Sequence, residues 1–238
     1  MTSKPNVDAV ILDGAALAHM LKPGGCNPFA DYSNKVFCPY VSSTMNGVSR
    51  TDIVWDRYSN ESLKADTRSR RGTGKRRRVE PATKLPQNWS DFLKRDENKE
   101  ELFLFLSKEC VKVKTPGQII STIGSEVLLK DAGDMSNLTP CNHEEADTPR
   151  FVHLYDCVMQ GYRKLLIRTV DTDVVVLAIS VFGRVDMLEL WVAYGVGKHF
   201  RYLAAHDIAR ALGPNKSLAL PFFMHSQDVL LFRSFTAK

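Results

Sequence analysis

Two aspartates two residues apart, Asp171 and Asp173, follow an apolar stretch and are the first candidates for chemistry. Residues 165–167 before them have the composition of a buried strand, and residues 174–179 after them are almost purely apolar. Ionised carboxylates are costly to bury unless they are paired, hydrogen-bonded or bound to a metal. Open α/β sheets place their ligands at the carboxyl ends of strands. A plainer interpretation is that Asp171 turns the chain and Asp173 caps the next helix.

The pattern of an acid at a strand end occurs twice more, nearer the N-terminus. Residues 7–12, apolar except for Asp8, form a short strand that ends at Asp13, and residues 51–55, with the apolar run Ile53-Val54-Trp55, form a second strand that ends at Asp56. A further acidic cluster lies at residues 144–147, where a helix is expected to start. The acids at strand ends and helix starts are Asp13, Asp56, Glu145, Asp147, Asp171 and Asp173. Because the carboxyl ends of parallel strands lie on one edge of a sheet, we expect these side chains to converge on one pocket.

Several carboxylates in one pocket repel each other, so divalent cations or protonation of some acids must stabilise the arrangement. Oxygen ligands favour Mg²⁺ or Mn²⁺, whereas zinc favours histidine and cysteine. Two such ions about 3.5–4 Å apart activate a water and stabilise the leaving oxygen of a phosphodiester. The acidic set therefore predicts a two-metal site for phosphodiester hydrolysis.

A basic run at residues 68–78 has seven Lys or Arg in eleven residues, two glycines and no apolar residue. Its cations are Arg68, Arg70, Arg71, Lys75, Arg76, Arg77 and Arg78. We expect it to be a solvated loop or an arch outside the core. One interpretation is a plain charge run or a nuclear-import signal at residues 75–78. The other is a clamp for nucleic-acid phosphates, with salt-dependent and largely sequence-independent affinity.

The elements that position these residues alternate between strands and helices, which favours an α/β fold with a mostly parallel sheet. We expect a hairpin around Gly124 and a linker at residues 79–97. The expected helices are residues 15–21, 28–45, 59–71, 97–110, 146–160 and 204–212, and the expected strands are residues 7–12, 51–55, 165–167 and 188–193.

Two of these segments carry more specific expectations. In the helix at 146–160, Val152, Tyr155, Val158 and Met159 are expected to point inward. After the last strand, residues 195–198 read Gly-Val-Gly-Lys, which resembles a phosphate loop but lacks the spacing of a nucleotide-binding P-loop.

Composition indicates a soluble protein with a substantial core. The chain has 238 residues, of which 44% are hydrophobic and 25% charged, and a net charge of +5. Its five cysteines form no CxxC pair, which predicts reduced thiols in an intracellular protein. No stretch approaches the ~20 apolar residues of a membrane span, so no membrane is expected as a partner. We expect a nuclear or cytoplasmic protein, and residues 75–78 favour the nucleus.

In their order, these motifs resemble the flap-endonuclease branch of the PIN-like nucleases. The matching stretches are ILDGAALAHML with Asp13, IVWDRYSNESLKADTRSRR with Asp56, EEADT with Glu145 and Asp147, and RTVDTDVVVLA with Asp171 and Asp173. The resemblance implies a single three-layer, Rossmann-like domain over residues 1–238, with a basic arch inserted at about 59–97. It implies that the six acids are catalytic metal ligands. It also implies that Lys64 and the cations of the basic run contact nucleic acid, with DNA as the expected substrate.

A closer resemblance is to a multicopy group of animal proteins often found near mobile elements, which share phrases such as CNHEEADT and RTVDTDVVVLA. Both groups continue after the last strand into a Gly-x-Asp type of motif. Here the chain instead reads ALPFFMHSQDVLLFRSFTAK, so an atypical, truncated tail is expected from about residue 221. We therefore expect a structure-selective, metal-dependent nuclease. The alternatives are a catalytically weak or inactive nucleic-acid-binding module and a fragment derived from a mobile element.

Overall fold

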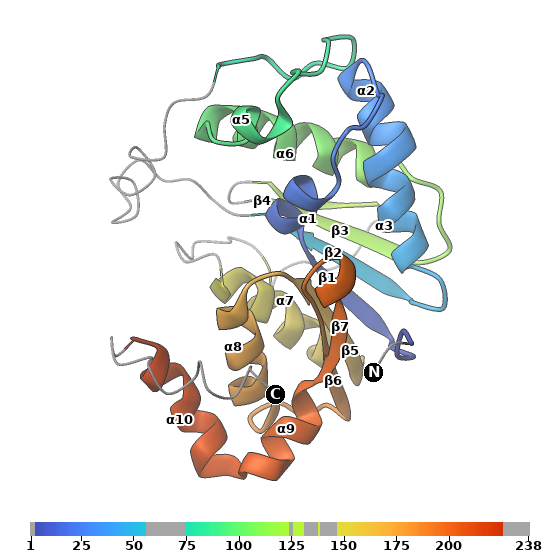
Figure 1. Cartoon of the computed structure of the whole chain (residues 1–238). Coiled ribbons are helices and arrows are strands. Elements are labelled where there is room, and N and C mark those ends of the chain that lie inside the picture. Colours follow the sequence, from blue (N-terminus) through green and yellow to red (C-terminus); the bar gives the residue numbers. More distant parts are fainter. Residues whose placement is uncertain (1–2, 56–74, 124–125, 131–137, 139–146, 226–238) are drawn as a thin grey trace.

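The computed structural model describes residues 3–55, 75–123, 126–130, 138 and 147–225 (Figure 1). Their centre is a seven-stranded sheet in the order β4-β3-β2-β1-β5-β6-β7. The outermost pairs, β3 with β4 and β6 with β7, are antiparallel, and the other pairs are parallel. The strands are β1 (Ala9–Asp13), β2 (Arg50–Val54), β3 (Gln118–Ile123), β4 (Glu126–Leu129), β5 (Lys164–Thr169), β6 (Glu189–Tyr194) and β7 (Arg201–Ala204). The predictions of a mostly parallel α/β sheet and of a hairpin around Gly124 are confirmed.

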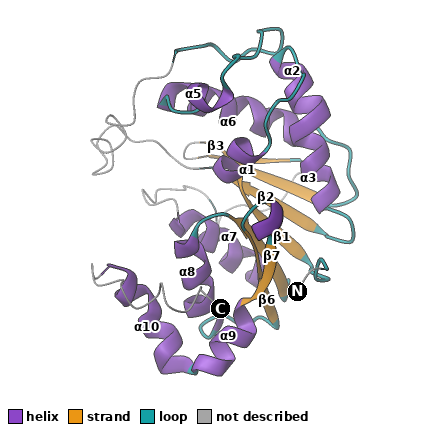
Figure 2. Cartoon of the chain, viewed as in Figure 1, coloured by secondary structure: helices purple, strands orange, loops and turns teal. Residues whose placement is uncertain are grey.

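Helices cover both faces of the sheet, so the protein has an α/β/α arrangement (Figure 2). The first face carries α1 (Gly14–Met20), α2 (Phe29–Tyr32), the π-helical turn η1 (Ser33–Phe37), α3 (Cys38–Thr44), α5 (Trp89–Phe92) and α6 (Asp96–Cys110). The second face carries α7 (Asp147–Met159), α8 (Thr172–Phe182), α9 (Ala205–Leu212) and α10 (Pro214–His225). A short 3₁₀ turn, η2 (Gly197–His199), joins β6 to β7.

Strand periodicity divides the apolar residues between two cores. In β1, Val10 and Leu12 pack with the helices of the first face, whereas Ala9 and Ile11 pack with those of the second. This follows from the period of two in a strand, in which successive side chains point to opposite faces. A strand buried on both faces reads as a continuous apolar run, which explains why these segments stand out in the sequence.

An aromatic cluster fills the core of the first face around Trp55. Its ring stacks on Phe103 with ring centroids 4.4 Å apart, and its indole N–H donates to Ser121 Oγ at 3.0 Å. A Cβ at Gly14 would lie 2.4 Å from the Trp55 ring. The residue after Asp13 must therefore be glycine for α1 to pack this closely on the end of β2.

The prediction of a linker at residues 79–97 is wrong in its second half. That half forms α5, and Trp89, Phe92 and Leu93 are buried in the first core. The Trp89 indole N–H also donates to the carbonyl of Ala18 in α1 at 2.9 Å. The segment contains few apolar residues, but those few are large and lie together, so it closes the core beside α1.

The predicted inward face of α7 is right only in part, because Val158 is buried in the second core, and the predicted start near residue 146 is confirmed. Tyr155 is 41% exposed and Met159 is 79% exposed. The buried side of the helix instead combines apolar residues with three polar ones, Arg150, His153 and Asp156. The helix is rotated from the expected orientation because these polar side chains find charged partners on the sheet.

Beyond β7, the chain adds a helix that was not expected from its sequence. The helix at 204–212 does end near Gly213, as predicted, but α10 begins at once with Pro214 and contains Pro221. The Ser217 hydroxyl donates to the carbonyl of Ala209, which ties α10 to α9. Among the described residues, no helix is both long enough and apolar enough to span a membrane.

Candidate functional site

The strand order reverses direction between β1 and β5. From β1 the chain adds β2 and β3 on one side, and it later adds β5 and β6 on the other. The helices that follow the two central strands, α1 and α8, lie on opposite faces (Figure 1). In open α/β sheets, the crevice at such a switch point, beyond the carboxyl ends of the strands, is the usual ligand site.

Asp13 is the last residue of β1 and lies at this switch point. Its Oδ1 accepts the Ala16 backbone N–H at 2.8 Å and caps α1. Its Oδ2 lies 2.9 Å from Arg150 Nη2, and the Thr169 hydroxyl lies 3.4 Å from the same oxygen. Asp13 and Arg150 are both almost fully buried. The negative charge of Asp13 is therefore balanced by an arginine from α7 and by a helix N-terminus.

Asp171 and Asp173 follow β5, the strand that neighbours β1 in the sheet. Asp171 caps α8, with its Oδ1 accepting the Asp173 backbone N–H at 2.9 Å. The prediction that Asp173 caps this helix is wrong, because Asp173 lies in its first turn. Both aspartates are exposed. The Asp171 N–H donates to Thr169 Oγ1 at 3.0 Å, so the Thr169 hydroxyl lies between Asp171 and Asp13.

Three of the six predicted acids thus lie at the carboxyl ends of two adjacent strands: Asp13 ends β1, and Asp171 and Asp173 follow β5. Asp147 is the first residue of α7, and its side chain lies outside the described part of the structure. Asp56 and Glu145 also lie outside the described residues, as do Lys64, Arg68, Arg70 and Arg71. Among the residues that are described, no three His, Cys, Asp or Glu side chains form a metal-binding group.

The described acids fit a hard divalent cation by donor type and by place. Asp13, Asp171 and Asp173 offer carboxylate oxygens, the ligands that Mg²⁺ and Mn²⁺ favour, at the edge where such sheets bind ligands. Asp171 and Asp173 are exposed, and Asp13 contacts Arg150. A cation at this edge would reach the exposed pair from solvent and would share Asp13 with the guanidinium.

The helix that presents Arg150 is fixed to the sheet by a buried charge network that the sequence did not reveal. Arg50 makes a two-pronged ion pair with Asp52, with contacts of 2.6 and 2.7 Å, and its Nη1 contacts Asp156 at 2.6 Å. His153 Nδ1 lies 2.6 Å from Asp52 Oδ2. All four side chains are buried, two on β2 and two on α7. The network sets the position of α7 and, through it, the position of Arg150 against Asp13.

The buried charges shift the pKa values within this network. Burial alone would raise the pKa of Asp52, but the hydrogen bonds from Arg50 and His153 outweigh it and lower the pKa. Burial would likewise lower the pKa of Arg50, but Asp52 and Asp156 raise it above its usual value. Asp52 is therefore an ionised carboxylate in the core, held by a permanent cation.

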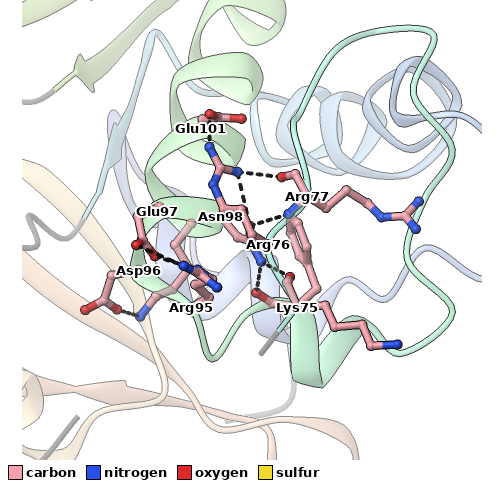
Figure 3. A network of polar contacts seen from close by, with 10 residues as sticks. Lys75, Arg76, Arg77, Arg95, Asp96, Glu97, Asn98 and Glu101 are labelled. Atoms are coloured by element: carbon pink, nitrogen blue, oxygen red, sulfur yellow. Dashed lines mark hydrogen bonds and ion pairs between the residues drawn. The ribbon is translucent and has the colours of Figure 1, made fainter. Parts of the chain in front are cut away.

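The described end of the basic run is a loop outside the core, as expected, with Lys75, Arg76 and Arg78 exposed, and it contacts α6. Figure 3 shows Asn98 at the centre of these contacts. Its amide donates to the Lys75 carbonyl at 2.8 Å, and its Oδ1 accepts the Arg77 N–H at 2.9 Å. The Arg76 guanidinium pairs with Glu101, which raises the pKa of Arg76 and lowers the pKa of Glu101. The side chains of Lys75 and Arg78 are exposed, so these two cations are open to a ligand.

Sequence reasoning missed Arg150 and Arg168, the two arginines buried at the carboxyl edge of the sheet. Arg168, in β5, donates to the carbonyls of Thr169, Ala193 and Gly195 at 2.7–2.9 Å. A charged residue within an apolar strand pattern was the available signal for Arg168. Arg150 carried no such signal, because its partner Asp13 lies 137 residues away in the sequence.

No protein-family model, curated protein or solved structure matches the chain. The fold is that of an α/β protein with a mixed, mostly parallel sheet. The candidate site is the group of aspartates beyond the carboxyl ends of β1 and β5, at the switch point of the sheet.

Proposed function

We propose that this protein is a metal-dependent phosphodiesterase acting on nucleic acid, with a PIN-like, flap-endonuclease type of site. The observation that carries the proposal is the position of Asp13 at the end of β1 and of Asp171 just after β5, the two strands that flank the switch point; the Thr169 hydroxyl contacts the carboxylate of Asp13 and the backbone N–H of Asp171. Acids at this position suit a divalent cation, and the basic run, whose end contacts α6, suits a polyanionic substrate.

Each group has a role in this proposal. Asp171 and Asp173 would hold the cation from α8, and Asp13 from β1, with Asp56, Glu145 and Asp147 completing a set for two ions of Mg²⁺ or Mn²⁺. When bound, such cations supply Lewis acidity to a phosphodiester. Arg150 holds the carboxylate of Asp13 in place through its 2.9 Å contact.

The substrate contacts in this proposal come from cations outside the core. Lys75 and Arg78 are exposed and would contact phosphates, together with Lys64, Arg68, Arg70 and Arg71. Arg76 and Arg77 would instead keep this segment anchored on α6, because both contact Asn98.

A second candidate function is nucleic-acid binding without catalysis. The ion pair between Asp13 and Arg150 favours it, because a buried guanidinium already supplies the positive charge that a metal would otherwise bring to Asp13. Cleavage assays separate the two functions, since both predict binding and only the first predicts metal-dependent product.

The test is cleavage of labelled 5′-flap and single-stranded DNA with Mg²⁺ or Mn²⁺. The decisive variant is Asp171→Asn/Asp173→Asn, because asparagine also caps helices well and should leave α8 intact. The matched control is Asp186→Asn/Asp207→Asn, which removes two exposed charges away from the switch point. Metal-dependent cutting by the wild type and the control, lost in the decisive variant, supports the nuclease. Binding without cutting by the wild type supports the second candidate.

A further inference from the structure

We propose that residues 195–201, the loop between β6 and β7 together with the first residue of β7, are a platform on which a base of single-stranded nucleic acid stacks. In this proposal Phe200 receives the base, while Lys198 and Arg201 hold the adjoining phosphates. The inference rests on the proposed function, because it names the form of the nucleic acid and the place where it enters. Its test uses binding without cleavage, so that the two can fail separately.

The loop leaves the sheet beside the exposed acids. Tyr194, the last residue of β6, is paired in register with Thr169 of β5, two residues before Asp171. Its hydroxyl is 2.9 Å from that of Thr172, the residue between Asp171 and Asp173. A chain lying across residues 195–201 would therefore reach the carboxyl edge at α8.

The loop presents an aromatic ring in a fixed position. The Arg168 guanidinium lies 5.2 Å from the Phe200 ring centroid, and Tyr202 meets the same ring edge to face at 5.0 Å. Arg168 is itself fixed by three backbone carbonyls, including that of Gly195. Phe200 is nevertheless 39% exposed. A ring held in this way loses little conformational freedom when a base stacks on it, which favours binding.

Backbone geometry at Gly195 closes the turn tightly. Its φ is +83°, in the region that favours glycine, and a Cβ there would lie 2.6 Å from the carbonyl oxygen of His199. The turn thus brings the backbone of residues 199 and 200 back over Gly195, and so places Phe200 above Arg168.

Charge and exposure point to a nucleic-acid strand as the occupant. Residues 194–204 contain Lys198, Arg201 and His199 and no acid, and all residues from 196 to 201 are exposed. Exposed cations beside an accessible aromatic ring are the elements with which proteins hold single strands. A duplex keeps its bases stacked on each other, so an aromatic platform selects unpaired nucleotides.

Fluorescence anisotropy of the full chain in EDTA tests the inference, with a labelled single-stranded 15-mer and a blunt duplex of the same length. Phe200→Ala should weaken single-strand binding by about 5- to 150-fold, the range expected for loss of one stacked base. Duplex binding should be unchanged. Phe200→Trp should preserve single-strand binding because it keeps a stacking face. The control is Phe222→Ala on α10, which removes a ring that is 77% exposed elsewhere on the surface.

A second variant does not depend on how well Phe200→Ala folds. Lys198→Ala/Arg201→Ala should lower the slope of log affinity against log salt by about 1.4, since each phosphate contact with a single strand contributes about 0.7. The inference would be overturned if the wild type binds DNA and both loop variants bind it with the same affinity and the same salt slope as the wild type. That result would leave the proposed function standing. Equal losses on single strand and duplex would overturn the claim of single-strand selection. If the wild type binds neither DNA, the inference and the proposed function both fail.

Discussion

At the scale of single residues, buried charges on α7 determine where the candidate site lies. His153 and Asp156 join that helix to Arg50 and Asp52 of β2, and Arg150 joins it to Asp13. Buried ion pairs of this kind add little net stability, but removal of one partner leaves an uncompensated charge in the core. The stability of the sheet and the geometry of the acidic edge are therefore linked through one helix.

Asp52→Asn should destabilise the protein by about 3–5 kcal/mol, because it leaves Arg50 without its two-pronged partner in the core. Urea unfolding at neutral pH measures the change. Asp186→Asn is the control, since the Asp186 side chain is 91% exposed and its loss should cost no more than about 0.5 kcal/mol. Equal stabilities of the two variants would show that the network contributes nothing specific.

The lowered pKa of Asp52 gives this change a pH signature. A carboxylate with a depressed folded-state pKa contributes stability that is complete above its unfolded value of about 4 and is lost as the pH falls through the lower folded value. Wild-type stability should fall in that acid range, and the fall should be smaller in Asp52→Asn. Urea midpoints measured from pH 7 to pH 2 report the difference. Parallel curves would contradict the assignment of an ionised Asp52.

Arg150→Gln should lower the melting temperature in EDTA and enlarge the increase produced by Mn²⁺. The melting temperature falls because the buried carboxylate of Asp13 loses the cation that compensates its charge. The Mn²⁺-induced increase grows because the metal no longer competes with the Arg150 guanidinium for Asp13. Thermal unfolding with and without Mn²⁺ measures both, and Arg150→Lys, which keeps a cation, is the control. An Mn²⁺ increment no larger than that of the wild type would argue against metal binding at Asp13.

At the scale of elements, pattern reasoning located most helices and strands but erred where charges are buried. Apolar periodicity found β1, β2, β5, β6 and α6, because these segments are buried on regular faces. It predicted the buried face of α7 only in part: Val158 is buried as expected, but Tyr155 and Met159 are exposed and His153 is buried. A helix sequence cannot reveal that a strand about a hundred residues earlier supplies Arg50 and Asp52 as partners for that face.

The helix α5 offers a direct test of how far the core extends into the predicted linker. Trp89→Ala should cost about 3–5 kcal/mol, because the ring is buried against Tyr32 and Phe92 and its N–H bonds to Ala18. Phe222→Ala, at an exposed ring, should cost no more than about 0.5 kcal/mol. Chemical denaturation compares the two. A small loss for Trp89→Ala would indicate that the segment packs only weakly.

At the scale of the whole molecule, the order of the strands turns a set of separated acids into a candidate site. The sequence predicted that strand-end acids would converge, and for Asp13 and Asp171 the strand order β1-β5 brings them to adjacent positions. The sequence did not predict that the reversal falls between these two strands, because strand order depends on crossovers that local patterns do not encode. The pairing of β6 with β5 places residues 195–201 beside Asp171 and Asp173.

The binding of Mn²⁺ to the full chain, measured by isothermal titration calorimetry, tests most directly whether this edge is a metal centre. We expect saturable binding to the wild type and to Asp186→Asn/Asp207→Asn, and at least about tenfold weaker binding to Asp171→Asn/Asp173→Asn, since two of the carboxylate ligands are lost. Equal Mn²⁺ affinity in all three proteins, or no binding by the wild type, would show that this edge is not a metal centre.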